Sequence, residues 1–190
     1  MSVSTLLELH ERAFAEFGGR VHAVGPDQWS APTPCTDWTV RDIVNHLTSE
    51  QLWVPPLLGG ATVEQVGSRF DGDVLGADPV SAWDSAATAA RAALAEPGAV
   101  ERTVHLSYGD RPAEFYVREL TSDLLLHAWD LARALGTDET LDAELVDAVL
   151  ASTEPHASEL AASGLFAPPV PVPAGADPQT RLIALSGRTP

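Results

Sequence analysis

Apolar residues recur at helical spacing through most of the chain. They fall three or four positions apart, which places them along one face of a helix. The pattern predicts five helices and a short last one, over 5–24, 39–58, 80–94, 113–135, 142–162 and 178–186. The sequence is therefore expected to fold as an all-α protein.

Turn-forming residues separate the predicted helices. Three prolines crowd the segment 25–38, and Pro55-Pro56 is expected to kink or end the second helix. The Gly-rich, acidic segment 59–79 is expected to form a loop with one turn of helix, at the rim of a site. Alternating residues followed by turn formers predict a small strand or hairpin near 101–112.

Length and composition are those of an ordinary globular chain. With 190 residues, 45% hydrophobic and 20% charged, we expect one domain over 1–190. No apolar run approaches the roughly 20 residues that cross a bilayer, which argues against a membrane protein. The first residues lack the basic and apolar regions of a secretory signal, so a cytoplasmic protein is expected.

Charge and cysteine content limit the binding partners and the metal ligands that the chain can use. Eleven basic and twenty-seven acidic side chains give a net charge of −16, which would repel a polyanion and argues against nucleic-acid binding. Cys35 is the single cysteine, so an internal disulfide and a Cys-rich zinc motif are both excluded. A metal ion would have to rest on histidine, carboxylate and water.

The residues that best fit a metal site lie in two predicted helices. Asp123 and His127 are four positions apart, which places them one turn apart on the same helical face. His46 lies beside the apolar stripe of the second helix and completes the set if the two helices pack side by side. Two imidazoles and a carboxylate leave a metal ion open positions for water or substrate, as in catalytic zinc sites.

Spacing alone leaves a second interpretation open. An Asp and a His one turn apart are common by chance, and most such pairs are solvated or hydrogen-bonded to each other. Burying an unpaired carboxylate costs on the order of several kcal/mol, so each group needs a partner or a metal ion. The three residues are therefore either metal ligands or hydrogen-bonded polar groups of the core.

Several other residues are ambiguous from sequence. Asp42 is explained either as a first-turn acid favoured by the helix dipole or as a carboxylate that supports His46, and Asp130 has the same ambiguity beside His127. Cys35 is expected to be a small buried apolar residue. Tryptophans expected in the core are Trp38 and Trp129. Histidines expected at the surface, without acidic partners at useful spacing, are His10, His22, His105 and His156.

Three segments carry a resemblance to a known family. They are the run from Trp29 to His46 (WSAPTPCTDWTVRDIVNH), the run from Asp123 to Gly136 (DLLLHAWDLARALG) and the ending from Arg181 to Pro190 (RLIALSGRTP). Together they resemble the actinobacterial branch of the DinB-like superfamily. That branch includes the mycothiol-dependent maleylpyruvate isomerases and many proteins known only as metal-binding.

The resemblance implies a four-helix bundle with a metal site. Its ligands would be a histidine on the second helix and an acid-x-x-x-His motif on a later one, positions that His46, Asp123 and His127 match. The isomerases commonly carry glutamate where this chain has the shorter Asp123. They also have an additional C-terminal domain, whereas this chain ends soon after the bundle, which favours a metal-binding bundle over the isomerase reaction itself.

The resemblance also implies a class of activity. Relatives act as thiol transferases, so we expect a metal-dependent mycothiol S-transferase or thiol-assisted isomerase that uses a small-molecule thiol and an electrophile. Zinc is the expected metal and nickel an alternative. The sequence leaves a homodimer open. Two other interpretations stay open: a non-catalytic bundle that binds a metal or small ligand for stress response or regulation, and a purely structural interaction domain.

Overall fold

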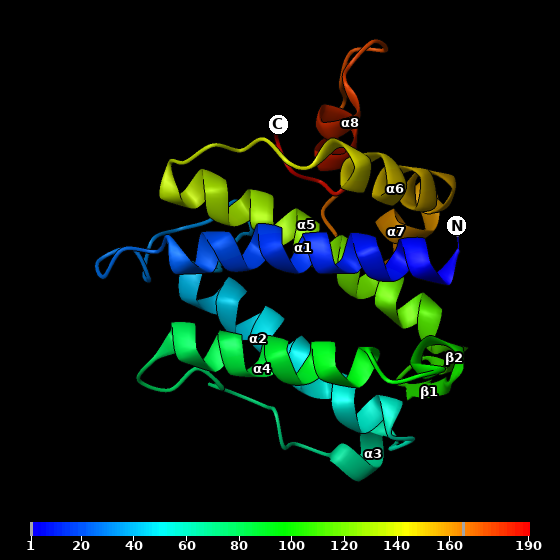
Figure 1. Ribbon diagram of the computed structural model, residues 1–190. Helices are drawn as coiled ribbons and strands as arrows, with labels where there is room; N and C mark the ends of the chain where they lie inside the picture. Colours follow the sequence, from blue (N-terminus) through cyan, green and yellow to red (C-terminus); the bar gives the residue numbers. More distant parts are fainter. Residues whose placement is uncertain (1, 165) are drawn as a thin grey trace.

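Four long helices form the body of the protein (Figure 1). The computed structural model describes residues 2–164 and 166–190. Helix α1 packs along α5 and also touches α4, while α2 packs along α4 and touches α5. The bounds of these helices are Val3–His22 for α1, Val40–Leu58 for α2, Pro79–Leu94 for α4 and Ala113–Leu135 for α5. The predicted four-helix bundle is confirmed.

Local signals fix where the bundle helices begin and end. Thr39 starts α2 with a capping box, in which its hydroxyl accepts from the Asp42 N–H and the Asp42 carboxylate accepts from the Thr39 N–H. Such a cap contributes about 1 kcal/mol. Gly136 ends α5 in the left-handed conformation, with φ 67°, which glycine adopts without steric cost. The prolines Pro55 and Pro56 lie in the last turn of α2, and the helix ends two residues later.

Accessory elements sit at one end of the bundle (Figure 1). The predicted turn of helix is α3, Val63–Val66, and the predicted hairpin is the antiparallel pair β1, Thr103–Leu106, and β2, Gly109–Pro112. A short 3-10 helix, η1, precedes the hairpin at Ala99–Glu101. The mostly helical fold with one small strand pair agrees with the sequence prediction.

The fifth predicted helix is broken. Instead of one helix over 142–162, the chain forms α6 (Ala143–Thr153), the 3-10 helix η2 (Glu154–His156) and α7 (Ala157–Ser163). Pro155 explains the break, because its ring cannot donate the backbone hydrogen bond that an α-helix interior requires. The short last helix predicted over 178–186 is α8 (Pro178–Leu185), and it packs against α6.

The core lies between the four long helices. Its largest fully buried side chains include Trp83, Trp129 and Phe17, so the prediction that Trp129 packs in the core is confirmed. None of the helices in the described ranges is both long and apolar enough to cross a membrane.

Candidate metal centre

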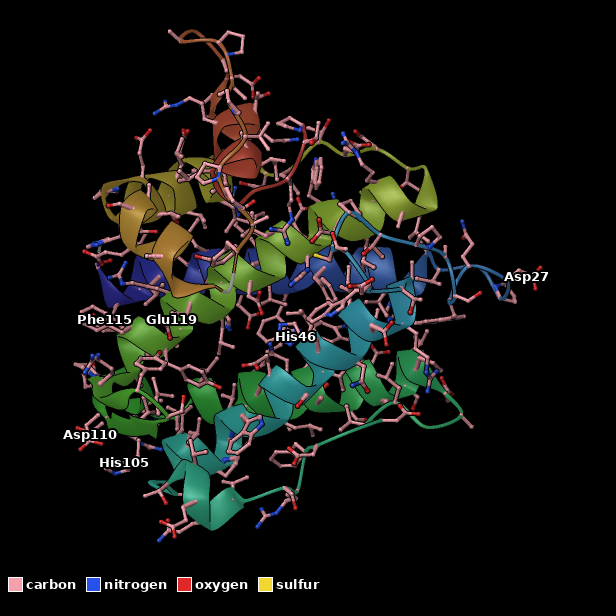
Figure 2. All side chains as sticks on the ribbon, turned by 180° about the vertical axis from the view of Figure 1, so that it is seen from behind. Asp27, His46, His105, Asp110, Phe115 and Glu119 are labelled. Atoms are coloured by element: carbon pink, nitrogen blue, oxygen red, sulfur yellow. The ribbon has the colours of Figure 1, made fainter. Side chains whose placement is uncertain are left out.

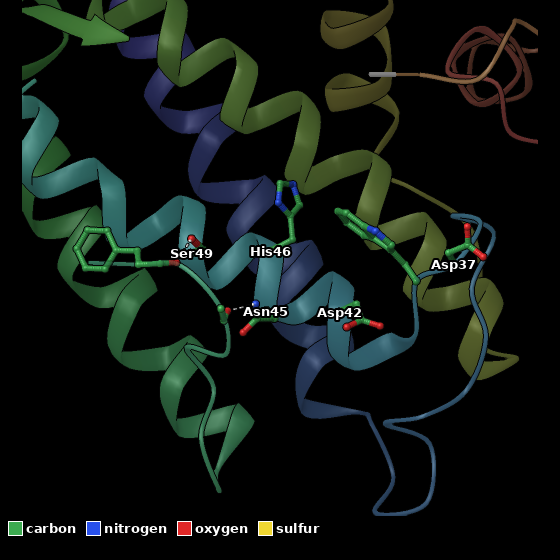
Figure 3. Close-up of a pocket in the computed structure, with 8 residues that line it drawn as sticks. Asp37, Asp42, Asn45, His46 and Ser49 are labelled. Carbon is green, nitrogen blue, oxygen red and sulfur yellow. Dashed lines mark hydrogen bonds between the residues drawn. The ribbon is translucent and has the colours of Figure 1, made fainter. Parts of the chain in front are cut away.

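The structure brings the three predicted ligands together. The Nε2 atom of His46 lies 2.9 Å from Oδ2 of Asp123, and Nε2 of His127 lies 3.3 Å from Oδ1 of the same carboxylate. One ligand atom from each residue falls within 4.8 Å of the other two. Figure 3 shows the His46 imidazole pointing from α2 toward α5. The shorter aspartate therefore still reaches both histidines.

Helix geometry and a tightly bonded loop place these side chains. Asp123 and His127 are one turn apart on α5, so the helix itself fixes their separation. His46 depends on the position of α2, which the preceding loop holds: Val40 N–H donates to Ala31 and Arg41 N–H donates to Trp29. The proline-rich segment before α2 thus acts as a structural support for the candidate ligand.

Electrostatics within the trio are strongly coupled. Burial alone would raise the pKa of Asp123, but the charges and hydrogen bonds of His127 and His46 outweigh burial and lower it. Burial alone would lower the pKa of His127, but the charge of Asp123 and the hydrogen bonds of Asp123 and Asp130 raise it well above its usual value.

The donor set fits a divalent metal ion. Two imidazole nitrogens and one carboxylate oxygen are the ligands of an open zinc site, with room for a further ligand. His46 and Asp123 each keep 30% of the side-chain surface exposed, whereas His127 keeps 8%. The exposed side leaves a path for such a ligand.

A cleft opens beside His46 (Figure 3). The segment between α3 and α4 closes its far side, because Asn45 donates to the Gly72 carbonyl at 2.9 Å and Ser49 donates to the Phe70 carbonyl at 3.0 Å. The predicted loop therefore does border the candidate site. Residues that line the cleft are Asp37, Trp38, Asp42, Asn45, His46, Ser49, Phe70 and Gly72.

Trp38 packs against the candidate ligands. Its ring stacks on His127 with centroids 5.7 Å apart and planes at 18°, and its centroid lies 5.1 Å from that of His46. The side chain is half-buried against the core, as predicted, but it also forms one wall of the cleft. Sequence reasoning missed this second role, although Trp38 stands only eight positions before His46.

Another carboxyl group follows the centre along α2. Glu50 is one turn after His46 and therefore on the same helical face. Burial raises the pKa of Glu50, while the nearby charge of His46 opposes that effect. A half-buried group with a shifted pKa thus adjoins the predicted ligands.

A second cluster lies behind His127. Of its members, the sequence analysis named Asp130 as one that could support His127, but it did not predict the parts of Cys35 and Arg188. The Nδ1 atom of His127 is 2.9 Å from Oδ2 of Asp130, whose side chain is fully buried. The Cys35 thiol donates to the same oxygen at 3.3 Å, and Arg188 donates two hydrogen bonds of 2.7 Å to the Asp130 carboxylate. Asp130 thus supports His127 from behind.

The expectation for Cys35 is corrected by this cluster. Cys35 was predicted to behave as a small buried hydrophobe, but it is half-buried and bonded to a carboxylate and a guanidinium. Arg188 was not singled out at all, although it stands in the terminal Gly-Arg-Thr-Pro run that resembles the family. The Asp42 carboxylate accepts hydrogen bonds from the N–H and the hydroxyl of Thr39, so Asp42 forms part of the cap of α2.

The remaining histidines differ from prediction. His10 is buried, not exposed, and its Nδ1 lies 2.9 Å from the Thr121 hydroxyl. Burial, reinforced by the charge of Arg91, lowers the pKa of His10 to about 3. His22 and His156 are exposed as predicted and His105 is half-buried, yet each of the three does have an acidic partner in space. These pairs are His22 with Asp84, His105 with Asp110 (Figure 2), and His156 with Glu159.

Fold and site together define a DinB-like helical bundle with a candidate three-residue metal centre between α2 and α5. The chain belongs to the mycothiol maleylpyruvate isomerase N-terminal domain family, whose profile matches residues 10–132. All three candidate ligands lie within that match.

Known relatives extend the likeness to nearly the whole chain. The uncharacterized proteins Rv0738 and MT0763, from Mycobacterium tuberculosis strains H37Rv and CDC 1551, are each 33% identical over 189 residues. Each match covers 96% of this chain and 97% of the relative. No solved structure gives a significant match.

Proposed function

We propose that this protein is a divalent-metal-dependent thiol S-transferase or thiol-assisted isomerase. His46, Asp123 and His127 are the proposed ligands, zinc the proposed metal, and mycothiol the proposed thiol. The convergence of the three side chains beside an open cleft is the observation that carries the proposal. Membership in a family named for a mycothiol enzyme supports the choice of thiol.

The chain supplies binding and orientation. A divalent cation held by the trio would lower the pKa of a coordinated thiol and so supply thiolate at neutral pH. Asp130 accepts from Nδ1 of His127, which turns Nε2 toward Asp123. The Trp38 ring covers one side of both imidazoles and limits the approach of water there. The cleft beside His46 is where the electrophile would enter.

No cysteine of the chain is needed as a nucleophile in this scheme. The thiol of Cys35 is engaged with Asp130 and Arg188 on the side of His127 away from Asp123. The attacking sulfur would therefore come from the small-molecule thiol.

Metal analysis and a conjugation assay test the proposal together. The protein is purified without chelator, its metal content is measured, and mycothiol conjugation to a general electrophile is followed. We expect about one ion per chain, lost in His46→Ala, with turnover lost in parallel. His22→Ala, which removes an exposed histidine on another face, is the matched control and should change neither quantity. A native protein that binds no divalent metal would contradict the proposal.

A non-catalytic metal-binding role is the second candidate. Its support is that Asn45 and Ser49, two polar residues of the cleft, are already engaged in holding the loop that follows α3. Stoichiometric metal without thiol-dependent turnover over a panel of electrophiles would favour this role. His46→Ala would then lose metal with no activity to lose.

A further inference from the structure

His127 belongs to two overlapping groups of metal-ligating side chains. Its Nε2 faces Asp123 and His46, whereas its Nδ1 faces Asp130 at 2.9 Å and Cys35 at 4.0 Å. In the inner group of Cys35, His127 and Asp130, one ligand atom from each residue again lies within 4.8 Å of the others. A thiolate, an imidazole and a carboxylate are all good zinc ligands, so ligand chemistry alone does not favour the outer group.

Arg188 distinguishes the two groups. Its Nε and Nη2 atoms each donate to a different oxygen of Asp130 at 2.7 Å, and Nη2 also lies 3.4 Å from the Cys35 sulfur. The side chain is 9% exposed and that of Asp130 is not exposed at all. Both oxygens of the Asp130 carboxylate therefore already accept hydrogen bonds from the guanidinium, which also contacts the Cys35 sulfur. A metal ion in the inner group would need the same atoms as ligands. Because arginine stays protonated, its charge there is permanent.

Backbone contacts of the chain after α8 position the Arg188 guanidinium. The Arg188 N–H donates to the Ile183 carbonyl, and Arg133 donates to the Thr189 carbonyl at 2.6 Å. Gly187 has φ 79°, and a Cβ atom at that position would overlap the carbonyl group of Ala167. Backbone contacts on both sides of Arg188 thus fix its position before any ligand is bound.

We propose that Arg188 selects between the two overlapping metal sites. It acts as a built-in cation that closes the inner group to metal and holds Asp130 on Nδ1 of His127, which leaves Nε2 for the outer group. The closed inner group is then a latent metal site with a thiolate ligand. The choice of the outer group rests on the proposed function, but the latent site does not.

Cobalt(II) titration reads out which group binds, because a thiolate ligand gives a sulfur-to-cobalt charge-transfer band. Wild type should show no such band, and Cys35→Ser should leave cobalt affinity within about two-fold of wild type. Arg188→Met should gain the band, and Arg188→Met combined with Cys35→Ser should lose it again. Arg188→Lys, which keeps a positive charge, should show none.

Control variants distinguish the specific role of Arg188 from the effects of misfolding or of removing any arginine. Arg181→Met removes a surface arginine of α8 that pairs with Glu154, and it should behave as wild type. Arg188→Gln is a second neutral variant should Arg188→Met fail to fold, and it should also gain the band. A charge-transfer band in wild type would overturn the proposal, as would a folded Arg188→Met or Arg188→Gln protein without one.

The same titration separates this proposal from the proposed function. If wild type binds no cobalt, the outer group is not a metal site and the proposed function fails. The latent site would still be confirmed by cobalt binding, with the thiolate band, in the neutral Arg188 variants alone.

Discussion

The two sides of His127 carry similar side chains but differ in how the negative charge of the aspartate is balanced. On the outer side, Asp123 faces two histidines and remains 30% exposed toward a cleft. On the inner side, Asp130 is fully buried and is neutralised by Arg188. Similar residue types therefore form a candidate metal site around Asp123, and a structural ion pair where Arg188 adds a permanent positive charge beside Asp130.

Removing the inner carboxylate should give the largest stability loss. Asp130→Asn leaves Arg188 buried without its partner, which typically costs about 3–5 kcal/mol. Asp123→Asn, measured with chelator present, should cost less than Asp130→Asn, because the Asp123 side chain keeps 30% of its surface exposed whereas that of Asp130 keeps none. Urea unfolding of both variants measures the difference. Equal losses would show that the two sides are not energetically distinct.

Metal should stabilise the protein through the outer side alone. At a free zinc concentration of about 100 times Kd, binding adds about 2.7 kcal/mol to the stability of the folded state. Asp123→Asn should abolish that gain, whereas Asp130→Asn should retain it with affinity weakened by about 10–100-fold. Thermal melts at increasing zinc concentration measure both effects. A gain that survives in Asp123→Asn but not in Asp130→Asn would reverse the assignment.

His10 differs from both sides of His127, because it is buried and its hydrogen-bond partner is the Thr121 hydroxyl instead of a carboxylate. Its pKa is lowered to about 3 in the fold, against 6.5 in the unfolded chain. Between these values the unfolded chain binds the proton and the folded chain does not, so stability falls as pH falls through this window. The slope is up to about 1.4 kcal/mol per pH unit, and stability from this source is complete above pH 6.5.

The variant His10→Leu should flatten the pH profile. Its stability, measured by urea unfolding, should fall less steeply below pH 6.5 than that of wild type. His22→Leu, which removes an exposed histidine, is measured in parallel as the control. A profile of His10→Leu parallel to that of wild type would show that His10 does not stay neutral in the fold.

The smallest effect is expected at Asp42. Hydrogen bonds from the Thr39 hydroxyl and N–H lower its pKa, as expected for a helix cap. Asp42→Ala should cost about 1 kcal/mol of stability and leave zinc affinity unchanged. Calorimetric titration with zinc checks the second point. An affinity loss of about 10-fold or more would instead make Asp42 a support of His46.

The sequence predicted what depends on local spacing. The bundle helices follow from apolar periodicity, and the caps at Thr39 and Gly136 follow from residue type. The pair Asp123 and His127 follows from helix geometry. His46 follows from its place beside the apolar stripe of the second helix, and the family resemblance points to the same three residues. Pro155 could have revealed the break between α6 and α7, because proline disrupts a helix interior.

The inner cluster could not be predicted in the same way. Arg188 and Cys35 are 153 positions apart, and only the path of the chain after α8 brings them together. No periodic pattern reports such a contact. The burial of His10, by contrast, could have been predicted, because His10 is four positions from both Leu6 and Phe14 and so shares their buried face. Its hydrogen-bond partner Thr121, 111 positions away, could not.

X-ray absorption of the zinc-loaded protein identifies the atoms that bind the metal ion. Zinc–sulfur bonds are about 2.3 Å long and zinc–nitrogen bonds about 2.0–2.1 Å, so the two kinds of ligand are separable. We predict a zinc ion with two imidazole ligands, oxygen in the remaining positions and no sulfur from Cys35. A zinc–sulfur shell in the absence of added thiol, or a protein that takes up no zinc, would contradict the account.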